Sequence, residues 1–222
     1  MNKEERIQYQ EIRLLNIECE EPYDWDEEDA THLRVCMPAG YENSSEMLCR
    51  GFYLADRTLD VSINLVRSKL DFAAMVRIEP IITSQRRGEV LEIARRSFPT
   101  DRRFHLSYAP NSAVSDKVLA VWVNGLSEYY LCQHKGAAIG FLALTGDEQQ
   151  KSVHLAAVLE RYRTSGAAMS LYAAAARDCK TAGVRFLNGR ISSANPAVMN
   201  LYSYLGASFS NPCDVYIKEV SL

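Results

Sequence analysis

Hydrophobic residues that recur every three or four positions predict helices in four segments of this chain. Residues that favour a helix end or start support three of them. Pro99 follows the first, Gly183 follows the third, and Pro196 suits the first turn of the fourth. The predicted helices span residues 87–98, 114–126, 168–182 and 195–204.

Segments in which apolar and polar residues alternate, or in which short apolar runs lie between turn residues, predict β-strands. The segment 29–38 fits either a short helix or a strand, and Pro38 stops it. Residues 135–136 and 145–148 are typical of hairpin connections. We expect strands at 51–57, 59–66, 75–80, 128–134, 137–144, 153–159, 184–191, 207–209 and 215–220.

The pattern breaks near residues 69–71, after which a new first strand begins. The part before the break reads as a small mixed domain. Its acidic segment, residues 18–29, reads as a solvated loop and helix start. We therefore expect a smaller N-terminal α/β domain over residues 1–75 and a second domain over residues 76–222.

The composition is that of an ordinary globular protein. The 222 residues are 47% hydrophobic and 24% charged, with a net charge of −3, which excludes a disordered or collagen-like chain. A pI near 5.9 argues against a nucleic-acid partner, because phosphate neutralisation needs clustered Lys and Arg. The arginines occur in pairs and do not form a stripe.

The six cysteines show neither a C-x-x-C spacing nor a neighbouring His at zinc-ligand distance, so we expect no metal site. No apolar run reaches the length of about 18 residues that a membrane span needs. We expect a cytoplasmic protein that does not bind membranes. The cysteines are Cys19, Cys36, Cys49, Cys132, Cys179 and Cys213.

The loop before the third predicted helix could hold an anion, because the first amides of a helix lack internal partners and lie at the positive end of its dipole. Gly166 allows close approach of a phosphate, Ala167 and Ala168 keep the first turn free of bulk, and Arg161 or Arg163 can add charge. A plain turn fits the same residues, since neither known glycine-rich phosphate loop is present.

Asn195 and Tyr202 lie seven residues apart on the fourth predicted helix, and therefore on one face. They could form a polar line into a cleft at the carboxyl side of neighbouring strands. The alternative is an N-cap asparagine and a half-buried tyrosine.

These segments together resemble the GCN5-related N-acetyltransferase (GNAT) superfamily. Arg163, Gly166 and Ala168 match its coenzyme A loop, [Q/R]-x-x-G-x-[G/A]. Its later helix, N-x-x-A-x-x-x-Y-x-x-x-G-F, is followed with small shifts, although Ala207 stands where phenylalanine is commonest. The matching residues there are Asn195, Met199, Tyr202, Gly206 and Phe209.

The resemblance implies an α/β acyl-CoA acyltransferase fold, in which helices flank a mixed, mostly antiparallel central sheet. It also implies acetyl-CoA as co-substrate, with its pantetheine slotted between strands 153–159 and 184–191. Backbone near Ala157 and Val158 would bind the pantetheine, Asn195 would hydrogen bond the cofactor, and a backbone amide would stabilise the oxyanion. The diphosphate would contact Arg163, Thr164, Ser165, Gly166, Ala167 and Ala168.

Tyr202 is our candidate general acid, because a phenol can donate a proton to the departing sulfur. No covalent intermediate is needed, since the amine attacks directly in a ternary complex. The general base is left open between Glu160, His154 and water. Met169, Leu171 and Tyr172 on the third helix are interpreted as core.

Further segments, including residues 50–54 and 122–124, resemble the family of dTDP-fucosamine acetyltransferases. That likeness implies a nucleotide-linked 4-amino-4,6-dideoxy sugar as acceptor and, as an expectation only, a homodimer. A nucleotide diphosphate needs cations and aromatic faces, and a loop packed on the core is the alternative. The candidate acceptor residues are Arg103, His105, Tyr108 and Trp122.

Two other functions are kept open. The first is acetyl transfer to another small amine, an amino acid or a protein N-terminus, which a poor charge fit of segment 103–122 to a diphosphate would favour. The second is a non-catalytic acyl-CoA-binding module, which would be indifferent to the loss of the Tyr202 hydroxyl.

Overall fold

The computed structural model describes residues 2–9, 12–68, 77–81, 86–99, 101, 103–106, 112–126 and 128–220. Its strands are β1 (Lys3–Tyr9), β2 (Ile12–Glu18), β3 (His32–Pro38), β4 (Tyr53–Asn64), β5 (Arg77–Ile81), β6 (Glu128–His134), β7 (Ala137–Gly146), β8 (Gln150–Val158), β9 (Phe186–Ser192) and β10 (Ser208–Glu219). Its α-helices are α1 (Tyr41–Cys49), α2 (Arg87–Ser97), α3 (Ser112–Gly125), α4 (Ala167–Thr181) and α5 (Pro196–Tyr204).

The strands of the described residues form one mixed sheet in the order β1-β2-β3-β10-β4-β9-β8-β7-β6-β5. Within it the β2–β3 and β8–β9 pairs are parallel, and the remaining pairs are antiparallel. Such a sheet, mostly antiparallel and flanked by helices, is the fold class that the sequence predicts.

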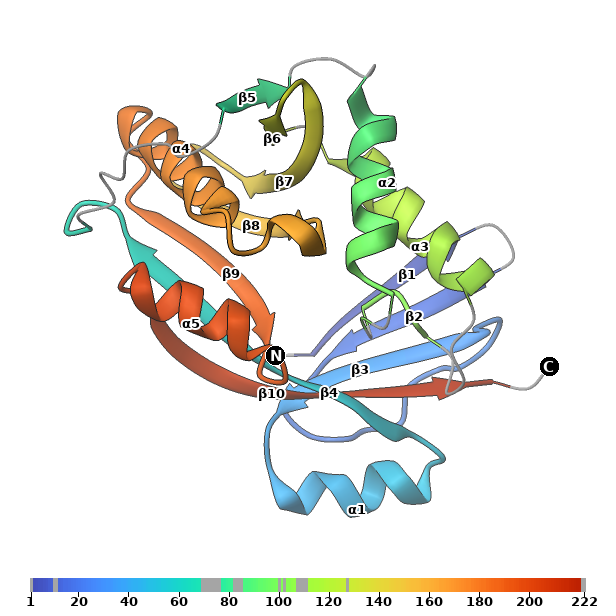
Figure 1. The fold of residues 1–222 in the computed structure, drawn as a ribbon. Helices are drawn as coiled ribbons and strands as arrows, with labels where there is room; N and C mark the ends of the chain where they lie inside the picture. The colour runs from blue at the N-terminus through green and yellow to red at the C-terminus, as the bar shows by residue number, and fades with distance from the viewer. Residues whose placement is uncertain are drawn as a thin grey trace.

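Helices cover both faces of the sheet (Figure 1). On one face α2 and α3 pack on β7 and β8 through buried residues such as Ile93, Leu119 and Leu155. On the other face α4 and α5 enclose a second cluster, which includes Leu171 and Tyr202. A third cluster joins Met47 of α1 to β2, β3 and β10. The helix stripes in the sequence are therefore the faces that are buried.

The residues that begin α5 and end α4 are those that the sequence predicts. Asn195 is the N-cap of α5 and accepts a hydrogen bond from the Val198 amide at 3.2 Å. Gly183 adopts a positive φ of 84° just after α4, the conformation that favours glycine at a helix end.

Two expected strand pairs are each a single strand. The segments 51–57 and 59–66 are joined in β4, and 207–209 and 215–220 are joined in β10. In β10, the residues that suggest a turn form a bulge, where the register shifts between Ser210 and Cys213. Asn211 has a positive φ of 48° there. The segment 29–38 contains a strand, β3.

The expected boundary between residues 75 and 76 does not separate two sheets. β10 lies between β3 and β4, and β9 pairs with β4, so strands from both sides of the boundary share one ladder of hydrogen bonds. Strands β1 and β2, which the hydrophobic pattern does not predict, extend this sheet at one edge.

Candidate functional site

β8 and β9 run parallel and then separate, which opens a fork in the middle of the sheet. Their pairing begins at Gln150 and Phe186 and ends at Val153 and Gly189. Beyond that point β8 continues to Val158, paired with β7 alone. The β8 backbone from residue 154 onward, including Ala157 and Val158, therefore has no β9 partner.

A β-bulge marks the start of the fork. Val153 pairs with Leu144 and Leu155 pairs with Ala143, so His154 is an extra residue on β8. A bulge of this kind turns consecutive side chains to one side of a sheet. Leu155 belongs to the cluster beneath α2 and α3, and the His154 ring stacks on Trp122 of α3, so both point to that face.

Tyr202 reaches the same point from the opposite face. It is only 1% exposed within the α4–α5 cluster. A Cβ atom built on Gly189 would lie 2.9 Å from the Tyr202 hydroxyl oxygen. The hydroxyl therefore lies against the last residue of β9 that pairs with β8, at the apex of the fork.

Tyr172 of α4 holds the Tyr202 hydroxyl. Its own hydroxyl donates a hydrogen bond to that of Tyr202 at 3.0 Å, and the two rings pack edge to face with centroids 5.3 Å apart. Burial raises the pKa of Tyr172 to about 12, and burial and Tyr172 together raise the pKa of Tyr202 well above its usual value. Both phenols are thus protonated at neutral pH, and the Tyr202 hydrogen is available to a third group.

An ion pair occupies the α2/α3 side of the fork. The Arg103 guanidinium donates to the Asp101 carboxylate at 3.0 and 2.7 Å and lies over the rings of Phe98 and Phe104. Burial alone would raise the pKa of Asp101, but the Arg103 charge and its hydrogen bonds lower it. The side chains of Arg103 and Asp101 stay 28% and 23% exposed, so the pair is still open to solvent.

A second carboxylate, Asp56 of β4, adjoins this pair. Ser192 at the end of β9 donates to Asp56 Oδ1 at 2.7 Å, as does the Arg57 amide at 2.8 Å. Burial raises the pKa of Asp56, although these hydrogen bonds oppose the shift, and the charges of Asp101 and Arg103 also act on it. Arg34 of β3 also lowers the pKa of Asp101, so the charges of two carboxylates and two guanidiniums balance here.

His154 also faces Arg103. Burial lowers its pKa, and the Arg103 charge lowers it further, so the imidazole is neutral at pH 7. Trp122 covers its ring at a centroid distance of 4.7 Å, and Phe104 packs on the other side of Trp122. The Arg103 charge also opposes the rise that burial causes in the pKa of Tyr202 and Tyr172, so Arg103 lies within electrostatic range of all three groups.

The loop before α4 has the features of an anion site. Gly166 is its N-cap at a positive φ of 77°, and no side chain caps the helix. Thr164 and Ser165 are exposed, and Arg163 donates to the Val158 carbonyl at 3.4 Å, which ties the loop to β8. The first amides of α4 are thus open at the wide end of the fork.

The remaining predicted residues are placed differently. Asn195 is exposed and its side-chain oxygen caps α5, the alternative interpretation given above. His105 is buried, and both ring nitrogens are sealed from solvent without a partner among the described residues. Glu160 is exposed in the turn after β8, away from the bulge. Tyr108 lies outside the described residues.

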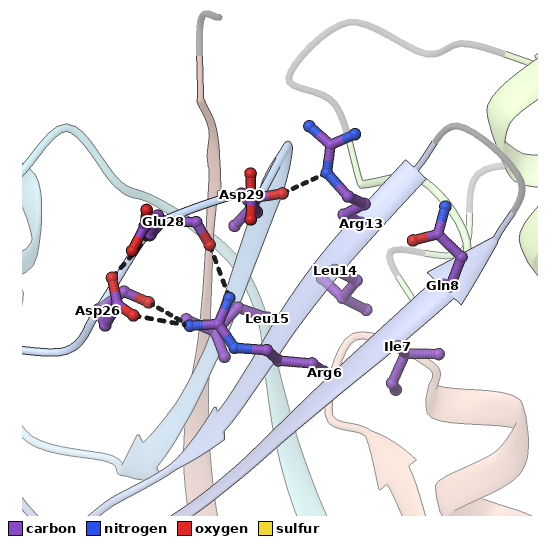
Figure 2. Close-up of a pocket in the computed structure, with 10 residues that line it drawn as sticks. Arg6, Ile7, Gln8, Arg13, Leu14, Leu15, Asp26, Glu28 and Asp29 are labelled. Atoms are coloured by element: carbon purple, nitrogen blue, oxygen red, sulfur yellow. Dashed lines mark hydrogen bonds and ion pairs between the residues drawn. The ribbon is translucent and has the colours of Figure 1, made fainter.

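A separate hollow of about 410 Å³ lies beside the β1–β2 hairpin (Figure 2). Its two arginines already bind the loop that follows β2. Arg6 donates to the Glu28 carbonyl at 2.7 Å and to Asp26, and Arg13 donates to the Asp29 carbonyl. Both arginines that line the hollow therefore hold the loop in place, and neither is free to bind a ligand.

The described segments contain no helix long and apolar enough to cross a membrane. They also contain no group of three or more His, Cys, Asp or Glu side chains that could hold a metal ion.

The sequence profile of the acetyltransferase (GNAT) family matches residues 88–207, just over half of the chain. A search of curated proteins finds no match. Among solved structures, a functionally unknown conserved protein from Staphylococcus epidermidis is similar, with a TM-score of 0.67 and 14% identity over 86% of this chain and 74% of that one.

Two further structures share the fold. A tandem GNAT protein from the clavulanic acid biosynthesis pathway has a TM-score of 0.58 and 14% identity, over 87% of this chain and 66% of that one. A GCN5-related N-acetyltransferase from Sphaerobacter thermophilus has a TM-score of 0.56 and 13% identity, over 86% and 62%. The chain thus spans about two thirds of the length of these two proteins. The comparisons support the family and not the narrower likeness to dTDP-fucosamine acetyltransferases.

Sequence reasoning missed four residues of the fork. Tyr172 lies in the apolar stripe of α4 and was interpreted as core, while Asp56, Asp101 and Gly189 belong to no motif. Gly189 is placed by the pairing of β9 with β8, and Asp56 is tied to the end of β9 by Ser192. Tyr172 and Asp101 are placed by the packing of α4 and by the ion pair with Arg103.

Proposed function

Because the chain belongs to the acetyltransferase (GNAT) family, we propose that it transfers an acetyl group from acetyl-CoA to an amine. One observation carries the proposal. The buried Tyr202 hydroxyl lies at the apex of the β8–β9 fork, against Gly189, with a hydrogen available for donation. A proton donor is needed there if the thioester lies in the gap, because the thiolate leaves toward that apex.

The residues before α4 fit the diphosphate of acetyl-CoA. The uncapped amides after Gly166 offer donors at the positive end of a 15-residue helix. Arg163 and the exposed Thr164 and Ser165 would add contacts. The unpaired β8 backbone at Ala157 and Val158 would bind the pantetheine, and Asn195 would use its side-chain amide.

Tyr202 would act as the general acid and Tyr172 would orient it. In Tyr172→Phe we expect kcat to fall about fivefold, because loss of a hydrogen bond worth about 1 kcal/mol frees the Tyr202 hydroxyl to rotate. The KM for acetyl-CoA should stay unchanged. Initial rates measure both constants.

Tyr130→Phe is the matched control for Tyr172→Phe. It removes another buried tyrosine hydroxyl, which bonds to Asp178 at 3.1 Å and does not contact Tyr202. An equal fall of kcat in both variants would mean that Tyr172 acts only through general stability.

The acceptor is the finer part of the proposal. A nucleotide-linked 4-amino-4,6-dideoxy sugar remains the acceptor that the sequence resemblance suggests, with Arg103 and Trp122 as contacts. A specific observation favours a second candidate, a small amine. Arg103 is already paired with Asp101, so it is not a free cation for a diphosphate, and a small amine does not need such a cation.

The test offers labelled acetyl-CoA to a panel of amines, followed by mass spectrometry. The panel holds dTDP-4-amino-4,6-dideoxyhexoses, polyamines, free amino acids and a peptide. Label on the amino sugar would support the first acceptor, and label on another small amine would support the second. Binding of acetyl-CoA without transfer to any member would contradict the enzymatic proposal and favour a non-catalytic acyl-CoA-binding module.

A further inference from the structure

We propose that His154 is the general base that removes a proton from the acceptor amine. The assignment rests on the proposed acetyl transfer, and it selects one residue where the sequence left Glu160, His154 and water. It follows from where the bulge places the imidazole, from what the imidazole contacts and from the charges that face it.

The position of His154 is complementary to that of Tyr202. The bulge puts His154 one residue beyond the last β8–β9 pair, on the face that α2 and α3 cover. Tyr202 reaches the same apex from the face that α4 and α5 cover. A carbonyl held in the gap would thus have a base on one side and an acid on the other. Attack and departure at a carbonyl need proton transfers at two different atoms, which this arrangement separates.

The imidazole is held in place and has an unused nitrogen. Its ring stacks on Trp122, tilted by 33°, which fixes its orientation. No hydrogen bond to either ring nitrogen is found within the described residues, and neither nitrogen is sealed from solvent as those of His105 are. Glu160, by contrast, is exposed in a turn that lies after β8.

The charges around His154 keep it ready to accept a proton. Arg103 faces it from the loop between α2 and α3. Asp101 and Asp56 adjoin Arg103, and the charge of Arg34 on β3 also acts on Asp101. On the other face of the sheet, Tyr172 and Tyr202 are neutral. Burial and the Arg103 charge lower the pKa of His154, so that its free form predominates above pH 6.5.

His154, Tyr202 and solvent account for every proton that moves in the reaction. His154 takes one proton from the bound ammonium group. The freed nitrogen lone pair forms the C–N bond, and the C–S bond breaks with its electrons on sulfur, which Tyr202 protonates. The nitrogen loses a second proton to solvent, from which Tyr202 is reprotonated. His154 releases its proton to water, so each turnover liberates one proton.

The test compares pH profiles of wild type and His154→Gln at saturating acetyl-CoA. The acceptor is a peptide with a free α-amine, or another amine if the panel identifies one. We expect the wild-type rate to rise through an ionisation below pH 6.5 and then stay level. The variant should instead rise tenfold per pH unit up to the pKa of the amine. For an amine with a pKa near 8, the loss at pH 7 is about tenfold.

Ser152→Ala, on the paired part of β8, is the matched control and should keep the wild-type profile. Affinity for acetyl-CoA and the urea midpoint are measured for each variant. A second measurement needs no variant to fold: the ¹⁵N shifts of the wild-type imidazoles should include one ring, in contact with Trp122, that is neutral at pH 7.

A His154→Gln variant with the wild-type pH limb, or a protonated His154 at pH 7, would overturn the assignment and leave acetyl transfer intact. Wild-type protein that transfers acetyl to no amine would instead contradict the proposed function, and the base with it.

Discussion

Replacing Tyr202 with phenylalanine is expected to lower kcat for acetyl transfer by about 10²- to 10⁴-fold, the usual contribution of a positioned general acid. The hydroxyl is the only part removed, and it lies at the apex of the fork where the sulfur would leave. Affinity for acetyl-CoA should stay within about threefold, because the proposed cofactor contacts lie on the α4 loop and β8. Single-turnover rates and calorimetric titration with acetyl-CoA measure the two effects.

Tyr204→Phe is the control for Tyr202→Phe. Tyr204 lies on the same helix but is 69% exposed, so the same chemical change there should leave kcat unchanged. The Tyr202 variant also leaves the buried Tyr172 hydroxyl without its hydrogen-bond acceptor, which should lower the free energy of unfolding by about 1 to 3 kcal/mol. If Tyr202→Phe kept its kcat within about threefold, the phenol would have only a structural role.

The second large effect is expected from Gly189→Ala. The new methyl group would lie 2.9 Å from the Tyr202 hydroxyl oxygen, closer than packed atoms allow, and 3.3 Å from Val61 Cγ2, which is a tight contact. The hydroxyl must shift, and a displacement approaching 1 Å at a reacting centre can cost about 10²-fold in rate. We expect kcat to fall by about this factor, with a loss of about 1 to 3 kcal/mol in stability from overpacking.

A double-mutant cycle separates displacement of the hydroxyl from other effects of the methyl group. Tyr202→Phe removes the oxygen that the new methyl group would meet. Adding Gly189→Ala to Tyr202→Phe should therefore reduce the rate little further, and should destabilise the protein less than Gly189→Ala does in the wild type. Gly88→Ala is the control, since a Cβ there meets no atom within 4 Å. Fully additive losses would show that Gly189 acts independently of Tyr202.

Much of the fold can be predicted from local patterns. The helices α2, α4 and α5 lie within a residue or two of the expected ranges, because a buried stripe and an end signal coincide in each. β1 was missed because Lys3–Tyr9 is an edge strand whose side chains are largely exposed, so it has no apolar alternation to detect. The single strand β10 was divided because Asn211 and Pro212 look like a turn until the bulge is seen.

The parts of the site that lie at one end of a helix can be predicted from the sequence. The parts that depend on which strands pair with one another cannot. Tyr202 and Gly166 each carry a local signal, a phenol on a capped helix and a glycine before one. His154 was considered as a base, but its bulge depends on which residues of β7 it opposes. The sequence predicts Arg103 as a cation for a diphosphate, but Asp101, two residues earlier, neutralises it, and this pairing depends on the fold of the loop.

The position of β10 has a consequence for how this chain folds. Residues 208–219 insert between β3 and β4, which are made about 150 residues earlier. Contacts so distant in sequence form slowly, because a long loop must close before they are gained. On the ribosome, the edges of β3 and β4 that face β10 would remain unpaired until β10 emerges. Completion of the sheet is therefore a late step of folding, and until then these edges are open to pairing with other chains.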